Sequence, residues 1–194
     1  GGGNMAAAIA GGLVRQGGHR VHIANRGKEK RERLAEELGV SVSEKLPDLA
    51  ADDVLVLAVK PKDMQAACQG VQTNGALVLS VAAGLSIATL SRYLGGTRRI
   101  VRVMPNTPGK IGLGVSGMFA DDSVSDQDKA AADSIMRAVG ITVWLDGEER
   151  LHDITGISGS GPAYVFYLLD ALKQAARQQG FGEEEARRLS LATF

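Results

Sequence analysis

A glycine- and serine-rich segment directly before a proline carries the strongest chemical signal in the sequence. Residues 155–161 hold three glycines and two serines, Pro162 follows, and an apolar helical run begins there. Proline suits the first position of a helix, because the N–H that it lacks would be unpaired there. With Ser160 or Gly161 as the cap, the helix start would present free N–H groups and a partial positive charge to an anionic group. The alternative interpretation is a flexible loop that only begins a helix.

A second glycine cluster opens the chain. Gly1, Gly3 and Ala6 fit the dinucleotide-binding fingerprint G-x-G-x-x-A, in which the glycines allow a tight turn and a close approach of pyrophosphate to the backbone. A glycine-rich linker or tag would look the same. The fingerprint also requires a strand before its first glycine, and the sequence has none there. We therefore expect a trimmed or partly ordered version of a longer protein.

The residues after the second expected strand, 20–24, bear on which cofactor would bind. An NAD site carries Asp or Glu about 20 residues past the glycines, to bond the ribose 2′-hydroxyl. Asn25 and Arg26 stand there instead, and the planar fork of donors on an arginine suits a 2′-phosphate. Lys28, Lys30 or Arg31 would add positive charge. The pattern favours NADPH, with NADH as the weaker cofactor; the alternative is a solvated, charged helix start.

Composition excludes several classes of protein. Hydrophobic residues make up 44% of the chain, and 22 basic residues balance 22 acidic ones. We therefore expect a real core and no electrostatic footprint for nucleic acid or an anionic membrane. The single cysteine, Cys68, is expected to be buried packing in a reducing compartment. The apolar runs are too short to span a bilayer, so the expected location is cytoplasmic.

Hydrophobic patterning predicts alternating strands and helices. Strands are expected at residues 54–59, 76–81 and 100–104, each a buried, β-branched-rich run. Helices are expected at 5–16, 28–38, 63–68 and 87–94. This alternation predicts a Rossmann-type, doubly wound, mostly parallel α/β sheet, with ligands at the carboxyl ends of the strands. Small residues and prolines occupy those ends: Ala58, Val59, Lys60 and Pro61; Ser80 to Gly84; and Met104 to Pro108.

The pattern changes after Pro108. Two edge strands, 114–119 and 141–145, are expected around a helix at 125–139, with Trp144 in the strand core. A short helix at 148–154 would lead into the glycine-serine loop. Two further helices are expected, at 162–179 and 183–194. The first is apolar nearly all round, so we expect a partner chain or further sequence to cover it.

Five motifs, in this order and at this spacing, resemble those of the pyrroline-5-carboxylate reductase family. They are Gly-Gly-Gly-Asn-Met-Ala, Ala-Val-Lys-Pro, Ser-Val-Ala-Ala-Gly, Arg-Val-Met-Pro-Asn-Thr-Pro and Gly-Ile-Ser-Gly-Ser-Gly-Pro-Ala-Tyr. The resemblance implies reduction of L-1-pyrroline-5-carboxylate to L-proline with NADPH, the last step of proline biosynthesis. It also implies a Rossmann domain, residues 1–155 with its first strand missing. An all-helical dimerisation domain would begin at 156–194, incomplete here, and form a homodimer or higher homo-oligomer.

The resemblance also implies a set of site residues. The substrate-side loop would be Ser158, Gly159, Ser160, Gly161 and Pro162. In the family, a later loop holds the substrate carboxylate and a threonine that meets the ring nitrogen; it is expected beyond Phe194, so no catalytic residue is assigned. Contacts to the cofactor are expected from Gly1, Gly3, Asn4, Met5, Asn25, Arg26, Ala58, Val59, Lys60, Pro61, Val81, Ala82 and Ala83.

The residue types fit imine reduction. A protonated cyclic imine already accepts hydride, so catalysis depends mainly on positioning and on excluding water. Lys60 is interpreted as a structural residue, and the three histidines as surface or packing residues, with no metal site. Tyr164 and Tyr167 are interpreted as packing residues. The alternatives are an NADP-dependent dehydrogenase of the β-hydroxyacid type and a non-catalytic NADPH-binding protein.

Overall fold

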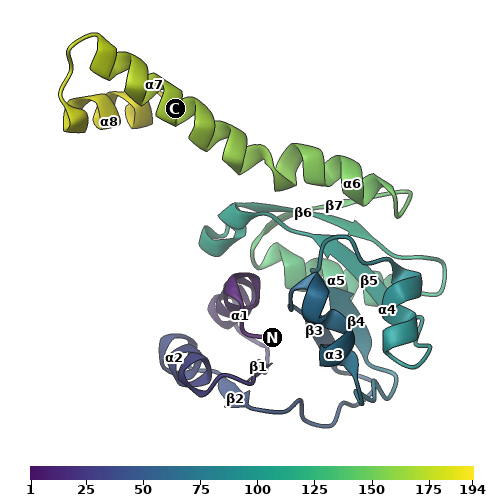
Figure 1. Cartoon of the computed structure of the whole chain (residues 1–194). Coiled ribbons are helices and arrows are strands. Elements are labelled where there is room, and N and C mark those ends of the chain that lie inside the picture. Colours follow the sequence, from purple (N-terminus) through teal and green to yellow (C-terminus); the bar gives the residue numbers. More distant parts are fainter.

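The chain folds into an α/β body from which a pair of helices projects (Figure 1). The computed structural model describes all 194 residues. Five strands form the main sheet in the order β3-β4-β5-β6-β7, and β1 and β2 form a separate two-stranded sheet. The strands are β1 (His22–Ala24), β2 (Ser41–Ser43), β3 (Val54–Leu57), β4 (Leu77–Ser80), β5 (Ile100–Met104), β6 (Gly114–Phe119) and β7 (Gly140–Trp144).

Pairing in both sheets is mostly parallel. β1 pairs with β2, β3 with β4, and β4 with β5 in parallel, whereas β6 runs antiparallel to β5 and parallel to β7. The predicted Rossmann-type α/β class is therefore confirmed. The first residues of the chain lie between the two sheets. Gly2 N–H donates to Asn25 Oδ1, just after β1, at 3.2 Å, and Gly1 packs against Ala58, just after β3.

Helices cover both faces of the main sheet. On one face, α1 (Asn4–Gln16) and α5 (Asp126–Arg137) bury an apolar cluster against β4, β5 and β6. On the other face, α3 (Met64–Cys68) and α4 (Ile87–Tyr93) bury a second cluster. Every residue of β4 is buried, as expected for a strand covered on both sides. Cys68 lies in the second cluster with 1% exposure, which confirms it as packing, and its burial raises the pKa of the thiol.

The remaining elements connect or extend this body. α2 (Lys28–Leu38) packs on the small sheet, and the 3-10 segments η1 (Pro61–Asp63) and η2 (Thr107–Ile111) follow β3 and β5. β2 and η2 were not expected from the sequence. None of the helices combines the length and the apolar character that crossing a bilayer requires.

Two expectations for the second half of the sheet were wrong. β6 is not an edge strand, because β5 and β7 pair with it on either side. Of these two expected edge strands, β7 alone lies at an edge of the sheet. Trp144 is not in the core, since it is 37% exposed and its indole N–H donates to Asp133 on α5 at 3.2 Å. A strand with no outer neighbour leaves part of its side chains uncovered, so position at the edge overrides the apolar pattern.

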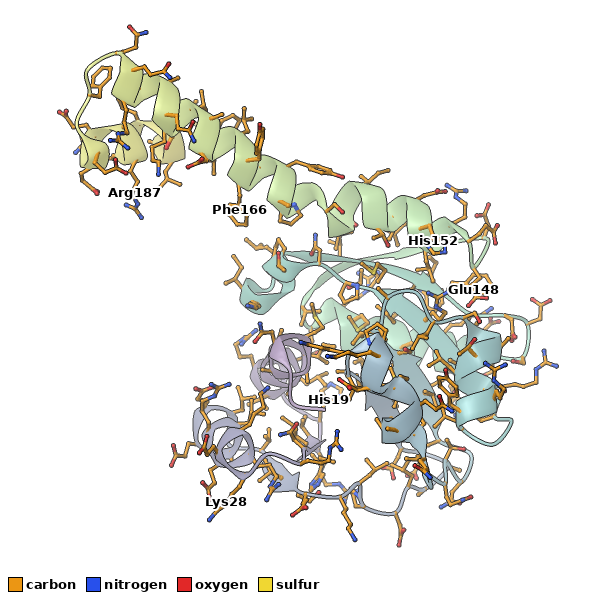
Figure 2. All side chains as sticks on the ribbon, viewed as in Figure 1. His19, Lys28, Glu148, His152, Phe166 and Arg187 are labelled. Carbon is orange, nitrogen blue, oxygen red and sulfur yellow. The ribbon has the colours of Figure 1, made fainter.

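The C-terminal part is a helical rod. α6 (Arg150–Ile154), the π-helical segment η3 (Thr155–Gly159) and α7 (Gly161–Gln178) follow one another, and α8 (Glu183–Ala192) folds back on α7. No residue of α7 is buried, and Phe166 and Tyr167 are 68% and 81% exposed. Figure 2 shows Phe166 on the projecting part of this rod, away from the sheet. The apolar helix predicted from sequence is thus present and uncovered within the single chain.

Candidate active site

The N-terminus of α1 is open to an anion. Its N-cap residue is Gly3, which has no side chain to accept from the first turn. The first helical hydrogen bond runs from Ala7 N–H to Gly3 C=O. The N–H groups of the preceding turn, from Asn4 to Ala6, are therefore free, and no acidic residue lies in this turn. A helix start of this kind favours a phosphate group. The structure thus places the predicted pyrophosphate contacts Gly3, Asn4 and Met5 at a suitable N-terminus.

Gly1 leaves no room for a side chain, because Ala58 and Val59 lie against it. A Cβ built on Gly1 would stand 2.6 Å from the carbonyl oxygen of Ala58 and 2.7 Å from a methyl carbon of Val59. Both distances are too short for non-bonded heavy atoms. At Gly3 the nearest atom to an added Cβ is 3.9 Å away, so this position is open on the ligand side. The structure therefore brings the glycine fingerprint together with the end of β3, as the strand-end argument predicts.

Asn25 and Arg26 follow β1 and differ in how they are held. Asn25 accepts from Gly2 N–H, and its own amide donates to Gly27 C=O at 3.3 Å. Its side chain thus ties the glycine fingerprint to the start of α2. Arg26 is exposed and makes no ion pair or side-chain hydrogen bond. A free guanidinium beside an open helix start fits a 2′-phosphate, whereas a carboxylate in its place would repel one.

The ends of β3, β4 and β5 lie next to one another in the sheet. Lys60 after β3 is exposed, forms no ion pair, and accepts through its backbone carbonyl from Asp63 N–H at 2.9 Å. Ala82 after β4 is buried in the second apolar cluster, whereas Ala83 is exposed. Ala58, Val59 and Val81 are half-buried, and Pro61 begins η1. These residues form one edge at which an extended ligand can lie across the sheet.

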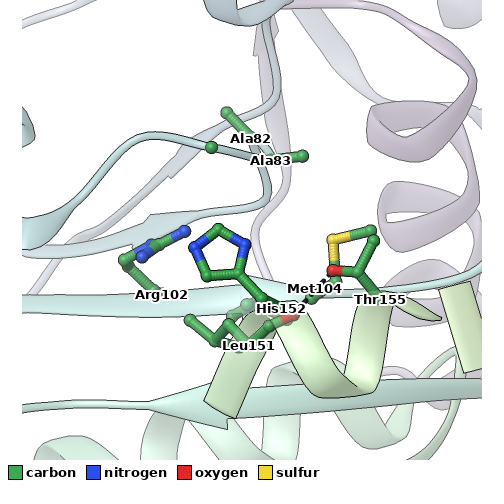
Figure 3. Close-up of a pocket in the computed structure, with 9 residues that line it drawn as sticks. Ala82, Ala83, Arg102, Met104, Leu151, His152 and Thr155 are labelled. Atoms are coloured by element: carbon green, nitrogen blue, oxygen red, sulfur yellow. Dashed lines mark hydrogen bonds between the residues drawn. The ribbon is translucent and has the colours of Figure 1, made fainter. Parts of the chain in front are cut away.

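A small pocket adjoins this edge (Figure 3). Figure 3 shows the guanidinium of Arg102 and the imidazole of His152 facing the loop that carries Ala82 and Ala83. Strand β5, the loop after β4 and helix α6 all contribute to it. The lining residues are Ala82, Ala83, Gly84, Arg102, Val103, Met104, Leu151, His152 and Thr155.

Arg102, which lines the pocket, is buried and forms an ion pair that the sequence did not predict. Arg102 is 6% exposed, and its Nη1 donates to Glu148 Oε1 at 2.9 Å. The same oxygen accepts from the backbone N–H of Ile87, at the start of α4, at 2.6 Å. One carboxylate therefore joins β5, α4 and the segment before α6. The sequence does contain one indication of this ion pair, an arginine inside an otherwise apolar strand, because a buried arginine requires a partner.

The glycine-serine segment is not a loop, contrary to expectation. Residues 155–159 form a π-helical turn closed by Ser160 N–H to Thr155 C=O at 2.8 Å, and the rod continues into α7 without a break. The N–H groups of Ala163 and Tyr164 both donate to Ser160 C=O. Ser160 is the N-cap of α7 and Pro162 lies in its first turn, as predicted. The expected row of free N–H groups is absent, because Pro162 has no N–H and the Ala163 N–H already has an acceptor.

Asn106 holds this π-helical turn against the sheet. In an α-helix, Ser158 C=O would accept from residue 162, but Pro162 has no N–H to donate. Asn106 is 8% exposed; its amide donates to Ser158 C=O at 3.0 Å, and its Oδ1 accepts from Val115 N–H at 2.8 Å. Sequence reasoning marked the strand end 104–108 but gave Asn106 no role. The structure thus places Ser158 to Pro162 beside the strand ends, as a helical wall.

The structure also shows where the three histidines and the two tyrosines of α7 lie. His19, His22 and His152 are all exposed, which confirms them as surface residues. Tyr164 and Tyr167 are 59% and 81% exposed, so neither is packed within the single chain, and Tyr164 donates to Gly156 C=O at 3.0 Å. Nowhere do three His, Cys, Asp or Glu side chains come together as metal ligands would.

Comparison with known proteins identifies the family. Residues 148–194 match the family model for pyrroline-5-carboxylate reductase dimerisation, and residues 1–84 match that for NADP oxidoreductase, coenzyme F420-dependent. The pyrroline-5-carboxylate reductase of Pseudomonas aeruginosa is 41% identical over 199 residues, covering 100% of this chain and 73% of that protein. The chain belongs to the pyrroline-5-carboxylate reductase family.

Solved structures of the family agree in fold. The pyrroline-5-carboxylate reductase of Coxiella burnetii has a TM-score of 0.85 at 37% identity, covering 100% of this chain and 74% of that one. The Plasmodium falciparum pyrroline carboxylate reductase, solved with NADP bound, has a TM-score of 0.81 at 27% identity, covering 100% and 73%. The predicted family and fold class are confirmed, and the dimerisation match indicates a homo-oligomer.

Proposed function

We propose that this protein reduces L-1-pyrroline-5-carboxylate to L-proline by hydride transfer from NADPH, as the final step of proline biosynthesis. The observation that carries the proposal is the relationship to pyrroline-5-carboxylate reductases along the whole chain, at 41% and 40% identity for those of Pseudomonas aeruginosa and Pasteurella multocida. The start of α1 supports it independently, because its free backbone N–H groups can bind a phosphate of the cofactor. NADPH supplies the hydride when bound.

The proposed cofactor site runs along the strand ends. Gly3, Asn4 and Met5 would hold the pyrophosphate at the start of α1, with Gly1 making the close turn. Asn25 and Arg26 would hold the 2′-phosphate, which makes NADPH the preferred cofactor and NADH the weaker one. The nicotinamide side would be lined by Ala58, Val59, Lys60, Pro61, Val81, Ala82 and Ala83.

The helical turn after α6 forms the proposed substrate side. Ser158, Gly159, Ser160, Gly161 and Pro162 would close the site over the substrate ring and limit the access of water. We propose residues 1–155 as the cofactor-binding domain and 156–194 as the start of the substrate and dimerisation domain. A second copy of the chain would cover the exposed face of α7. A cytoplasmic location stays a prediction.

The test is consumption of NADPH by the purified protein. Turnover with pyrroline-5-carboxylate, and none with the keto product of a 3-hydroxy acid, is expected. Turnover with the keto acid alone would assign the chain to the β-hydroxyacid dehydrogenases instead. Tight NADPH binding with no turnover of either substrate would favour a non-catalytic binding protein. NADH in place of NADPH, at equal concentration, completes the comparison and should support slower turnover.

A further inference from the structure

Arg31 differs from the other charged residues of α2. Sequence patterning marks residues 28–33 as a solvated charged face, and the side chains of Lys28 and Arg33 are indeed 78% and 60% exposed. The side chain of Arg31 is only 17% exposed. It folds back over the start of its own helix, where Nη1 donates to the carbonyl oxygens of Asn25 and Arg26, both at 2.8 Å.

These two hydrogen bonds fix the direction of the loop's N–H groups. Across a trans peptide the C=O and the following N–H point in opposite directions, and the chain has no cis peptide. The carbonyls of Asn25 and Arg26 face Arg31, so the N–H groups of Arg26 and Gly27 face away from it. Neither N–H donates to any acceptor in the chain. Both N–H groups are therefore available to an acceptor on the side of the loop that faces away from Arg31.

The start of α2 adds to the same side. Gly27 is the cap and supplies no side-chain acceptor, and the first helical bond is Arg31 N–H to Gly27 C=O at 3.2 Å. The N–H groups of the first turn are therefore free and follow the unpaired guanidinium of Arg26, while Glu29 is the acidic residue of this turn. The remaining charge of Arg31 is directed elsewhere, since its Nη2 lies 3.9 Å from Glu44 Oε2. Arg31 thus acts on the loop and not at the anion position.

We propose that Arg31 is a positioning residue that sets the preference for NADPH over NADH. By holding the carbonyls of Asn25 and Arg26 inward, it presents two backbone N–H groups and the Arg26 side chain to the 2′-phosphate. This inference rests on the proposed 2′-phosphate site at Asn25 and Arg26. NADH has no phosphate there, so the effect of Arg31 falls on NADPH alone.

The test compares Arg31→Met with Arg33→Met, which removes an exposed arginine two residues along the same helix. Binding of NADPH and of NADH is measured separately by titrating the fluorescence of the reduced nicotinamide, and folding by thermal unfolding. Arg31→Met should weaken NADPH about tenfold and change NADH by less than about twofold. Arg33→Met should change neither. If Arg31→Met does not fold, Arg31→Lys should show a smaller loss in the same direction.

A double variant separates positioning from direct contact. Because Arg31 acts partly through Arg26, Arg26→Ala combined with Arg31→Met should lose less NADPH affinity than the product of the two single losses. If the NADPH affinity of the double variant falls by the full product of the two single losses, the proposal is overturned. It is also overturned if both cofactors lose affinity equally, if Arg31→Met leaves NADPH affinity unchanged, or if the wild type does not prefer NADPH. Turnover of pyrroline-5-carboxylate by the wild type is measured separately, so failure of the proposed reaction is recognised independently.

Discussion

The ion pair between Glu148 and Arg102 allows the sharpest prediction of stability. Glu148 Oε1 accepts from Arg102 Nη1 at 2.9 Å and from Ile87 N–H at 2.6 Å. The side chain of Arg102 is 8% exposed. Glu148→Ala removes the acceptor of both donors and leaves a buried guanidinium without a counter-charge. Both consequences act in the folded state only, so the variant should be less stable.

The magnitude follows from how much water can reach the pair. Removing one partner of a buried ion pair costs about 3–5 kcal/mol. The side chain of Glu148 is 30% exposed, so water can partly replace it and the lower end, about 3 kcal/mol, applies. In a protein of this size each kcal/mol moves the Tm by about 2–4 °C. We therefore expect Glu148→Ala to lower the Tm by about 6–12 °C.

Two further variants make the assay specific. Glu148→Gln keeps an oxygen acceptor and loses the charge, so it should cost about 1–2 kcal/mol. Glu149→Ala removes the neighbouring exposed carboxylate and should stay within about 0.5 kcal/mol of the wild type. Urea unfolding followed by circular dichroism measures all three free energies against the wild type.

The order of the variants decides the outcome. If the ion pair stabilises the fold, the loss of unfolding free energy increases from Glu149→Ala through Glu148→Gln to Glu148→Ala. Arg102→Met should also recover stability in the Glu148→Ala background, because an apolar side chain needs no counter-charge. Equal stability of Glu148→Ala and Glu149→Ala would refute the account, as would further loss in the double variant.

Three other predictions concern the cofactor, acid stability and assembly. Arg26→Ala should weaken NADPH roughly ten- to a hundredfold and spare NADH, since only NADPH carries a phosphate for this side chain; a titration that shows equal losses would contradict the site. The Arg99 guanidinium, which bonds both oxygens of Asp128, lowers the pKa of that carboxyl, so its stabilising effect is present above about pH 4 and is lost below it. Asp128→Asn should therefore reduce the slope of unfolding free energy against pH in that acid range. An unchanged slope would show that Asp128 does not contribute to the loss of stability in acid. Phe166→Glu, on the exposed face of α7, should shift the protein to smaller species in sedimentation velocity, and an unchanged distribution would exclude this residue from the subunit interface.

Local sequence pattern was sufficient where burial dominates. The expected strands at 100–104 and 114–119 coincide with β5 and β6, and the expected helix at 28–38 coincides with α2. A strand covered on both faces leaves a mostly apolar run, and a surface helix leaves polar residues on its exposed side, so both can be recognised from the sequence. The glycine fingerprint and Asn25 were also found from spacing alone, and the structure places them in contact.

Local sequence pattern was insufficient to predict features that depend on contacts with a neighbouring segment. β2 has only three residues, Ser41–Ser43, and its pairing with β1 defines it as a strand. The direction of β6 depends on the path of the chain from β5 through η2, and its inner position depends on the pairing of β7 beside it. The same holds for Arg31, whose exposure cannot be read from its charge. For β2 and β6 the deciding partner is a strand outside the local window. For Arg31 the partners are backbone carbonyls only five and six residues back, whose direction the residue types do not indicate.

The glycine-serine segment shows why a correct motif can still suggest the wrong geometry. Pro162 was expected to begin a helix because it lacks an N–H, yet that same lack lets the π-helical turn leave Ser158 C=O free for Asn106. The side chain of Ser158 also donates to Ile154 C=O at 3.1 Å, so both of its polar groups are used within the protein. A loop at this position could move with the ligand. A helical wall fixed to the strand end by Asn106 would keep the proposed substrate side at a constant distance from the proposed cofactor edge, which suits a reaction that depends on positioning.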